Sequence, residues 1–394
     1  MTSIESGKAG LAMTDIKSGE TLELLQALIR NECVNTGEPE SGHEDRSVAT
    51  LADFFDTQGV EYEPLPGRRS VVYRVPGTDP SAPALMLMGH LDVVPVSRDG
   101  WSRDPFAGEV AEGMVWGRGT VDMLNLTASM AVAFRPYLQG DLPPLAGDLV
   151  YLGVADEEAG GVHGAKWLVE QHPEAVACDF LLTEIAFPPL RSGKGDLVYP
   201  VKVGEKGPHW RRFTASGTPA HGSQPHGTDN ALVKAARAIT AVVDSPSPVA
   251  ITDEWRAFVA GLELDEDRAE ALTNPDLIDA EIERIAESRP GYARYVHACT
   301  HLTLSPNVAT GGTKLNTVAD AAEAQIDIRV LPGQDELTVE GHLRKVLGPG
   351  FDDFEIEATM DHPANSSGIG GLLGEAIGDG FEHLTGSRRT IPAI

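Results

Sequence analysis

The sequence predicts an α/β fold in which a mostly parallel sheet is flanked by helices, with a smaller α+β domain inserted into it. Three observations favour this fold class. Short apolar runs at 84–89, 148–155 and 179–183 alternate with helical patterns, as in parallel sheets with crossover helices. After residue 197, apolar and polar residues alternate, as in half-exposed antiparallel strands. The chain has 394 residues, which is more than one ordinary domain contains.

Helical periodicity fills the intervals between the apolar runs. Apolar residues recur at the spacing of an amphipathic helix in four segments of the first half, 21–33, 45–58, 124–138 and 164–171. Thr21 is expected to cap the first of these helices. Each apolar run is short and continuous, so we expect strands that are buried on both faces.

The smaller domain is predicted from a second set of patterns. It has strand patterns at 197–204, 209–216 and 322–330 and a helical pattern at 230–243. The acidic stretch 245–300, which contains four prolines, is interpreted as helices and loops that elaborate this domain.

The chain is then expected to return to the first domain. A helix from 336 and a strand at 354–360 would pack there. We therefore place the first, metal-binding domain at 1–199 and 333–394, and the inserted domain at 200–332.

Charge and composition exclude several classes of partner. The chain has 31 basic and 59 acidic residues, a net charge of -28, and such a field repels nucleic acid and anionic membranes. Neither a secretory signal nor a run long enough to span a membrane is recognised. The three cysteines lack metal-type spacing, so we expect a reducing, cytoplasmic location.

Metal-compatible side chains follow three of the predicted strands. Because ligands bind at the carboxyl ends of strands in α/β sheets, these side chains point to one shared site. Singly, each has an ordinary interpretation: a satisfied loop histidine, a solvated acidic turn or a helix cap. Together, crowded carboxylates repel one another unless cations neutralise them. The set consists of His90 and Asp92 after the first run, Glu157 and Glu158 after the second, Glu184 after the third, and Asp122 before a helix.

Chemistry suggests a role for each member of this set. The carboxylate of Asp92 can reach back to His90 and fix its tautomer. Asp122 is short enough to bridge two ions. One of Glu157 and Glu158 can bind metal while the other stays free to accept a proton from water. Imidazole mixed with carboxylates suits zinc, with cobalt or manganese as alternatives.

Several motifs, in this order and spacing, give the chain a family resemblance. It resembles the dinuclear-zinc aminoacylase, carboxypeptidase and succinyl-diaminopimelate desuccinylase superfamily. The motifs are MGHLDVVPV (88–96), GRGTVDM (117–123), DEEAGG (156–161), GTPAHGSQP (217–225), NVATGGTKLNTV (307–318) and DIRVLPG (327–333).

The resemblance implies two metal ions and an assignment for each residue. His90, Asp122 and Glu184 would bind one ion, and Asp122 and Glu158 the other. Glu157 would be the general base and Asp92 would orient His90. The inserted domain would be a lid and dimerisation domain.

The same resemblance assigns three residues of the inserted domain to the substrate. His221 would help to stabilise the oxyanion, often from the partner subunit of a homodimer. Arg329 would grip a substrate carboxylate, which suits a guanidinium fork, and Asn316 would assist. The implied substrate is a dipeptide or an N-acyl amino acid with a free carboxylate.

One departure leaves two hypotheses open. The family has a last metal ligand, a histidine, after a glycine-rich turn near its C-terminus. Here RTIPAI (389–394) resembles the strand before that turn, and His342, His362 and His383 do not match the ligand. We expect either a truncated form or a degenerated site. The leading hypothesis is a metal-dependent hydrolase of amide or peptide bonds with Glu157 as base. The alternative is a non-catalytic or truncated relative that binds a metabolite or a protein partner.

Overall fold

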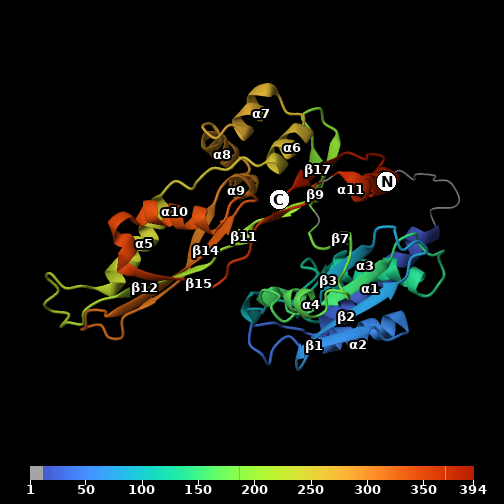
Figure 1. The fold of residues 1–394 in the computed structure, drawn as a ribbon, viewed down its shortest axis with the longest axis horizontal. Coiled ribbons are helices and arrows are strands. Elements are labelled where there is room, and N and C mark those ends of the chain that lie inside the picture. Colours follow the sequence, from blue (N-terminus) through green and yellow to red (C-terminus); the bar gives the residue numbers. More distant parts are fainter. Residues whose placement is uncertain (1–11, 186, 369) are drawn as a thin grey trace. The chain divides into compact units, whose positions relative to one another are not determined.

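The computed structural model describes residues 12–185, 187–368 and 370–394. The chain divides into two compact units, Met1–Ile185 and Ala186–Ile394 (Figure 1). Both combine helices with sheets, so the predicted α/β fold class with a second α+β part is confirmed. None of the helices in the described part of the chain is long and apolar enough to span a bilayer.

The first unit is built on a five-stranded sheet in the order β1-β2-β6-β3-β7. β6 and β7 both pair with β3 in parallel, whereas β1 and β2 extend the sheet with antiparallel pairings. The parallel strands are those predicted from the apolar runs. β1 and β2 were not predicted, and they make the sheet mixed. The strands are β1 (Val60–Leu65), β2 (Arg68–Val75), β3 (Leu85–His90), β6 (Leu149–Val154) and β7 (Phe180–Leu182).

Alternation along these strands builds a core on each face of the sheet. Tyr73 and Tyr151 pack with the apolar faces of the first three helices, while Met86 and Val150 pack with Leu168 of α4 on the other face. A strand buried on both faces must be apolar throughout, which explains the continuous runs. The helices are α1 (Ala12–Arg30), α2 (Asp45–Phe55), α3 (Leu124–Leu138) and α4 (Ala165–Gln171).

The predicted helices match these four, with one correction. Thr21 lies inside α1, not at its start, because the helix already includes Ala12. Shorter elements complete the unit: the hairpin β4 (Glu109–Ala111) and β5 (Met114–Trp116), and the 3₁₀ turns η1 (Arg98–Gly100) and η2 (Glu157–Ala159).

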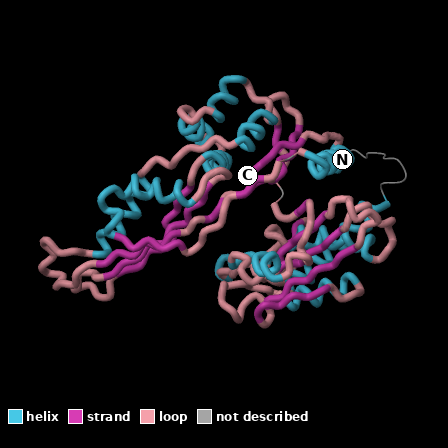
Figure 2. The backbone as a smooth tube through the Cα atoms, in the orientation of Figure 1, coloured by secondary structure: helices cyan, strands magenta, loops and turns pink. Residues whose placement is uncertain are grey.

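The second unit contains a long antiparallel sheet in the order β11-β14-β12-β15, with β13 also paired to β14 (Figure 2). Alternate residues of β14 are buried against α5 and α10, which lie along one side of the sheet in Figure 1. The bounds are β11 (Gly207–Pro208), β12 (Arg211–Ser216), β13 (Thr303–Gly311), β14 (Ala321–Val330), β15 (Phe354–Ala358), α5 (Ala231–Asp244) and α10 (Glu336–Leu347).

The acidic stretch 245–300 forms four helices, as predicted, around a core that includes Trp255 and Phe258. Ile391 of β17 belongs to the same core. The helices are α6 (Asp253–Gly261), α7 (Glu266–Thr273), α8 (Ile278–Ala286) and α9 (Pro290–Thr300). The remaining elements are β8 (Leu190–Arg191), β9 (Leu197–Lys202), β10 (Gly204–Glu205), η3 (Gly348–Asp353), β16 (Asn365–Ser366), α11 (Gly371–Thr385) and β17 (Thr390–Ala393).

Residues 333–394 pack differently from the predicted division of the chain. The sequence analysis grouped them with residues 1–199, but here they belong to the second unit. The reason lies in strand pairing, because β17 pairs in parallel with β9 and β15 pairs with β12. The boundary between the units follows Ile185, ahead of the predicted one. The assignment of 333–394 to a metal-binding domain stays a prediction.

Lys206 closes the C-terminal end of α9. Its ammonium donates hydrogen bonds to the carbonyl oxygens of Ala298 and His301, at 2.9 and 2.8 Å, and to the Thr303 hydroxyl. It thereby satisfies carbonyls that a helix end leaves without partners. Burial lowers the pKa of Lys206 to about 8.

We predict that Lys206 makes the protein more stable as the pH rises from 8 to 10. In this window the unfolded chain binds the lysine proton and the folded chain does not, so the free energy of unfolding rises with pH. The gain should be about 1–3 kcal/mol, and Lys206→Met should remove it. Urea unfolding at pH 7.5 and 9.5 measures this gain. Lys194→Met, at an exposed lysine, is the control, and an equal pH dependence in the native chain and the Lys206→Met variant would contradict the prediction.

Candidate metal centre

The predicted site residues of the first unit lie at the carboxyl ends of neighbouring parallel strands. His90 is the last residue of β3 and is opposite Val154, the last residue of β6. Glu157 and Glu158 begin the turn η2 just beyond β6. Because β3 and β6 run in the same direction, their ends bring the imidazole and the acidic turn to one edge of the sheet.

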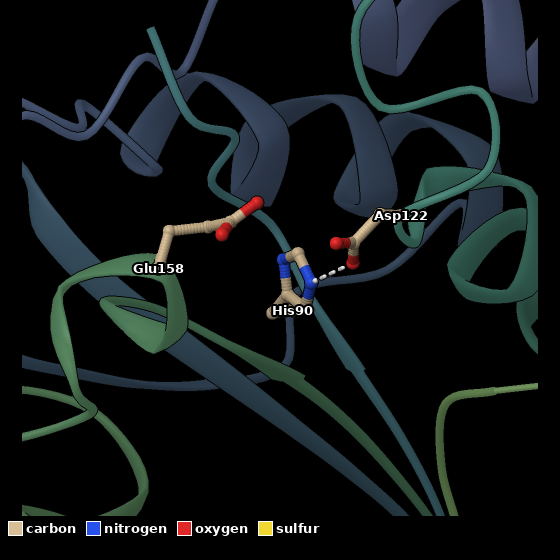
Figure 3. A group of neighbouring side chains, drawn as sticks. All are labelled: His90, Asp122 and Glu158. Atoms are coloured by element: carbon tan, nitrogen blue, oxygen red, sulfur yellow. Dashed lines mark hydrogen bonds and ion pairs between the residues drawn. The ribbon is translucent and has the colours of Figure 1, made fainter. Parts of the chain in front are cut away.

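His90 is the centre of the site. Its Nε2 lies 3.1 Å from Oδ1 of Asp122, 3.5 Å from Oε2 of Glu184 and 3.8 Å from Oε2 of Glu157. Ligand atoms of His90, Asp122 and Glu158 lie within 4.8 Å of one another. Figure 3 shows the imidazole between the two carboxylates. The His90 side chain is 1% exposed and that of Asp122 is 68% exposed, so one face of the site is open to solvent.

The tautomer of His90 is set by the main chain of Asp92. Nδ1 donates to the Asp92 carbonyl oxygen at 2.9 Å, which leaves Nε2 directed at Asp122 with a lone pair available for a cation. The sequence predicts this contact for the Asp92 carboxylate instead. That carboxylate is 3.6 Å from Nδ1, too far for a hydrogen bond. It accepts instead from the backbone N–H groups of Glu157 and Glu158, at 3.2 and 3.0 Å.

The protonation states show how strongly the acids crowd the imidazole. Burial opposes protonation of His90, but Asp122 and Glu184 outweigh it and raise the pKa to about 11. Burial raises the pKa of Glu157 to about 7, and that of Glu158 to about 7 as well. His90 opposes this shift in both cases, and repulsion by neighbouring carboxylates adds to it. A divalent cation would neutralise the crowded carboxylates, and the mixed nitrogen and oxygen donors fit zinc, cobalt or manganese.

The structure locates the remaining predicted residues in the second unit. His221 follows β12 in an exposed loop whose Gly222 N–H donates to the Asn316 carbonyl oxygen at 2.8 Å. The His221 and Asn316 loops are therefore neighbours near the start of β14. Arg329 lies near the other end of β14, where Nε is 3.1 Å from Oδ1 of Asp327. Their roles stay predictions.

A buried polar group behind the metal centre was missed by sequence analysis. No motif linked its members, which lie on separate loops and on β2, and only Asp156 falls within a recognised motif. Single polar residues that are far apart in the sequence carry no pattern that would predict their contact in the fold. The group consists of Asn35, Glu44, Arg68 and Asp156.

An α/β unit with a candidate cation site at its strand ends, followed by a separate α+β unit, defines the class of protein. Residues 86–290 match the model of Peptidase family M20/M25/M40, and the chain belongs to this family. The resemblance drawn from the motifs is thereby confirmed.

Known proteins share both sequence and fold with the chain. It is 34% identical over 230 residues to the succinyl-diaminopimelate desuccinylase of Methylorubrum extorquens (strain PA1), covering 56% of this chain and 57% of that protein. It is 27% identical over 285 residues to the probable carboxypeptidase S-like 2 of Dictyostelium discoideum, covering 71% and 54%. The chain thus matches a little over half the length of these curated relatives.

A solved structure shows the same fold. It is an M20 family metallo-carboxypeptidase from Sulfolobus solfataricus, with a TM-score of 0.70 and 19% sequence identity, and the match covers 95% of this chain and 86% of that one.

We predict that divalent metal stabilises the protein through Asp122. With zinc or manganese at 100 times its dissociation constant, the free energy of unfolding should rise by about 2.7 kcal/mol. Asp122→Asn should lose most of this gain, because it replaces one of the three converging donors by a neutral amide oxygen, a weaker ligand than a carboxylate. Thermal unfolding with and without metal measures the effect. Asp53→Asn, on α2, should behave like the native chain, and full stabilisation of the Asp122→Asn variant would exclude this site.

Proposed function

We propose that this chain is a metal-dependent hydrolase of the amide or peptide bond in a dipeptide or N-acyl amino acid with a free carboxylate. The observation that carries the proposal is the convergence of His90, Asp122 and Glu158 within 4.8 Å, at strand ends of a chain from a peptidase family. The mixed imidazole and carboxylate donors support binding of divalent metal, and we propose two ions, with zinc first and cobalt or manganese as alternatives.

The residues divide into ligands and a base. His90, Asp122 and Glu184 would hold one ion, and Asp122 and Glu158 the other. When bound, such ions polarise the scissile carbonyl and acidify water. Glu157 is left as the base, taking a proton from the attacking water and giving it to the leaving amine.

The second unit would recognise the substrate. The Arg329 guanidinium would form a two-pronged contact with the substrate carboxylate. His221 would donate to the oxygen on which negative charge develops, from the partner subunit of a homodimer, with Asn316 assisting. The neighbouring His221 and Asn316 loops support a joint role. All three cysteines are free thiols, in keeping with the proposed cytoplasmic location.

We predict that Glu157→Gln lowers kcat by about 10²- to 10⁴-fold, the usual contribution of a positioned general base. The amide keeps the shape of the side chain but cannot accept the proton, so metal affinity should change little. Turnover of metal-loaded protein is measured on a panel of dipeptides and N-acyl amino acids, with metal content counted by calorimetry.

Glu158→Gln is the matched comparison, because it should lose metal as well as activity. Unchanged turnover by the Glu157→Gln variant would remove Glu157 from its role. A full chain that binds no metal and turns over no member of the panel would favour the non-catalytic alternative.

We predict that Arg329→Met raises KM for carboxylate substrates by about 10- to 100-fold, which corresponds to one lost charged hydrogen-bond pair. Substrates with an amidated carboxyl group should show no such change. Arg212→Met is the control, since Arg212 lies on the adjacent strand and pairs with Glu357. Equal losses for both substrate types would argue that Arg329 serves only its ion pair with Asp327.

A further inference from the structure

A layer of buried polar side chains supports the turn that carries Glu157 and Glu158. Five side chains from separate segments meet there, and none is more than 3% exposed. Three are carboxylates and one is a guanidinium, so the layer holds more negative than positive charge. Its members are Asn35, Glu44, Arg68, Asp92 and Asp156.

Arg68, the first residue of β2, is the cation of this layer. Nη1 donates to Oε1 of Glu44 at 3.0 Å and lies 3.6 Å from Oδ1 of Asp156. Nη2 donates to Oδ1 of Asn35 at 2.7 Å. Two further bonds from Nη2, to the Glu38 carbonyl and the Ser41 hydroxyl, are each 3.1 Å long. The fork therefore binds both carboxylates and the amide at once.

Asn35 connects Arg68 to the metal centre through hydrogen bonds. Its Oδ1 accepts from Arg68, and its Nδ2 donates to Asp92 at 2.8 Å and to Asp156 at 3.2 Å. The amide can have only this orientation, because a guanidinium only donates and a carboxylate only accepts. Arg68 thus fixes which face of Asn35 meets Asp92.

Asp92 is the next link. Its two carboxylate oxygens accept from the N–H groups of Glu157 and Glu158, and its main-chain carbonyl accepts from His90. The position of this one residue therefore sets the imidazole and the acidic turn together. Within the described residues, the hydrogen bonds of Arg68 do not reach His90, Asp122 or Glu158.

A second route from Arg68 reaches the same turn. Oε1 of Glu44, which accepts from Arg68, lies 3.3 Å from the backbone nitrogen of Asp156 and accepts from it. Asp156 has a left-handed backbone, with φ of 69°, and its Oδ2 accepts from the His163 N–H at 2.8 Å. Few non-glycine residues adopt this conformation, so the contacts on both sides of Asp156 hold the start of the Glu157–Glu158 turn.

The loop over Arg68 leaves space for this arrangement. Gly42 has φ of +90°, and a Cβ there would lie 2.2 Å from Nη1 of Arg68 and 2.7 Å from the Glu44 carboxylate. The backbone therefore passes directly over the ion pair, and a glycine is required by both the conformation and the space.

Burying such a charged group is a poor way to stabilise a fold, because desolvation offsets most of the attraction. Its bonds to Asn35 and Glu44 nevertheless lead on to Asp92 and to the Glu157–Glu158 turn. We propose that Arg68 is a positioning residue for the metal centre, which it orients through Asn35 and Asp92 and through Glu44 and Asp156. The inference rests on the proposed function, since it concerns how that site is held in register for hydrolysis.

The test compares Arg68→Lys with Arg74→Met in the full chain. The lysine keeps the charge but lacks the fork, so it cannot hold Asn35 and Glu44 together. Zinc affinity should fall about 10- to 100-fold, the usual effect of changing a residue behind a metal ligand. The kcat should fall with KM unchanged, and the visible spectrum of the cobalt-loaded protein should shift. Arg74, on the same strand and paired with Asp148, should show none of these changes.

Asn35→Asp is a second variant, in case the first folds poorly. It keeps the shape of the side chain but turns the donor that faces Asp92 into an acceptor, and it should lose metal affinity at least as much. If both variants fold, bind zinc with unchanged affinity, keep the native kcat and show the native visible spectrum when loaded with cobalt, the positioning role is overturned and Arg68 is only structural. A native chain that binds neither zinc nor cobalt would instead overturn the proposed function, and this inference with it.

Discussion

The site depends on the repulsion among carboxylates that surround one buried imidazole. Asp122, Glu157 and Glu184 all lie within 4 Å of His90 Nε2, so three carboxylates crowd one imidazole. The fold keeps these groups together against that repulsion. His90 and Glu157 lie at or just beyond the parallel ends of β3 and β6, Asp122 lies in the turn before α3, and Glu184 follows β7. A divalent cation bound among these carboxylates would neutralise their repulsion, so the donors could stay close together.

The support for this edge comes from two kinds of packing. Below the strands, tyrosines and helix residues form an apolar core on one face, and Leu168 of α4 closes the other. Behind the strand ends the layer is polar, with Arg68 surrounded by acids. An apolar layer could fix the strands but could not bind the N–H groups of the Glu157–Glu158 turn. The carboxylate of Asp92 does so, and its burial then requires the donors on Asn35.

The parts that sequence predicted well are those with a local signal. The buried runs 84–89 and 148–155 became β3 and β6, and the acidic residues just after them meet as expected. Strands β1 and β2 were missed because β2 begins with two arginines, one of which is buried only by tertiary contacts. For the same reason Asn35 and Arg68 could not be assigned to the site. The placement of residues 333–394 depends on the pairing of β17 with β9, which no local pattern specifies.

Asp92 shows how the contacts of a predicted site residue can differ from those expected from the sequence. The histidine-x-aspartate spacing indicated that its carboxylate would orient His90, yet the main-chain carbonyl does this at 2.9 Å. The carboxylate is then free to bind the turn beyond β6, so one residue links two strands of the site. Because a backbone carbonyl orients the ring, the tautomer of His90 depends on the course of the chain after β3. The side chain sets the distance between the imidazole and the acidic turn, and the two halves of the metal centre are coupled through a single residue.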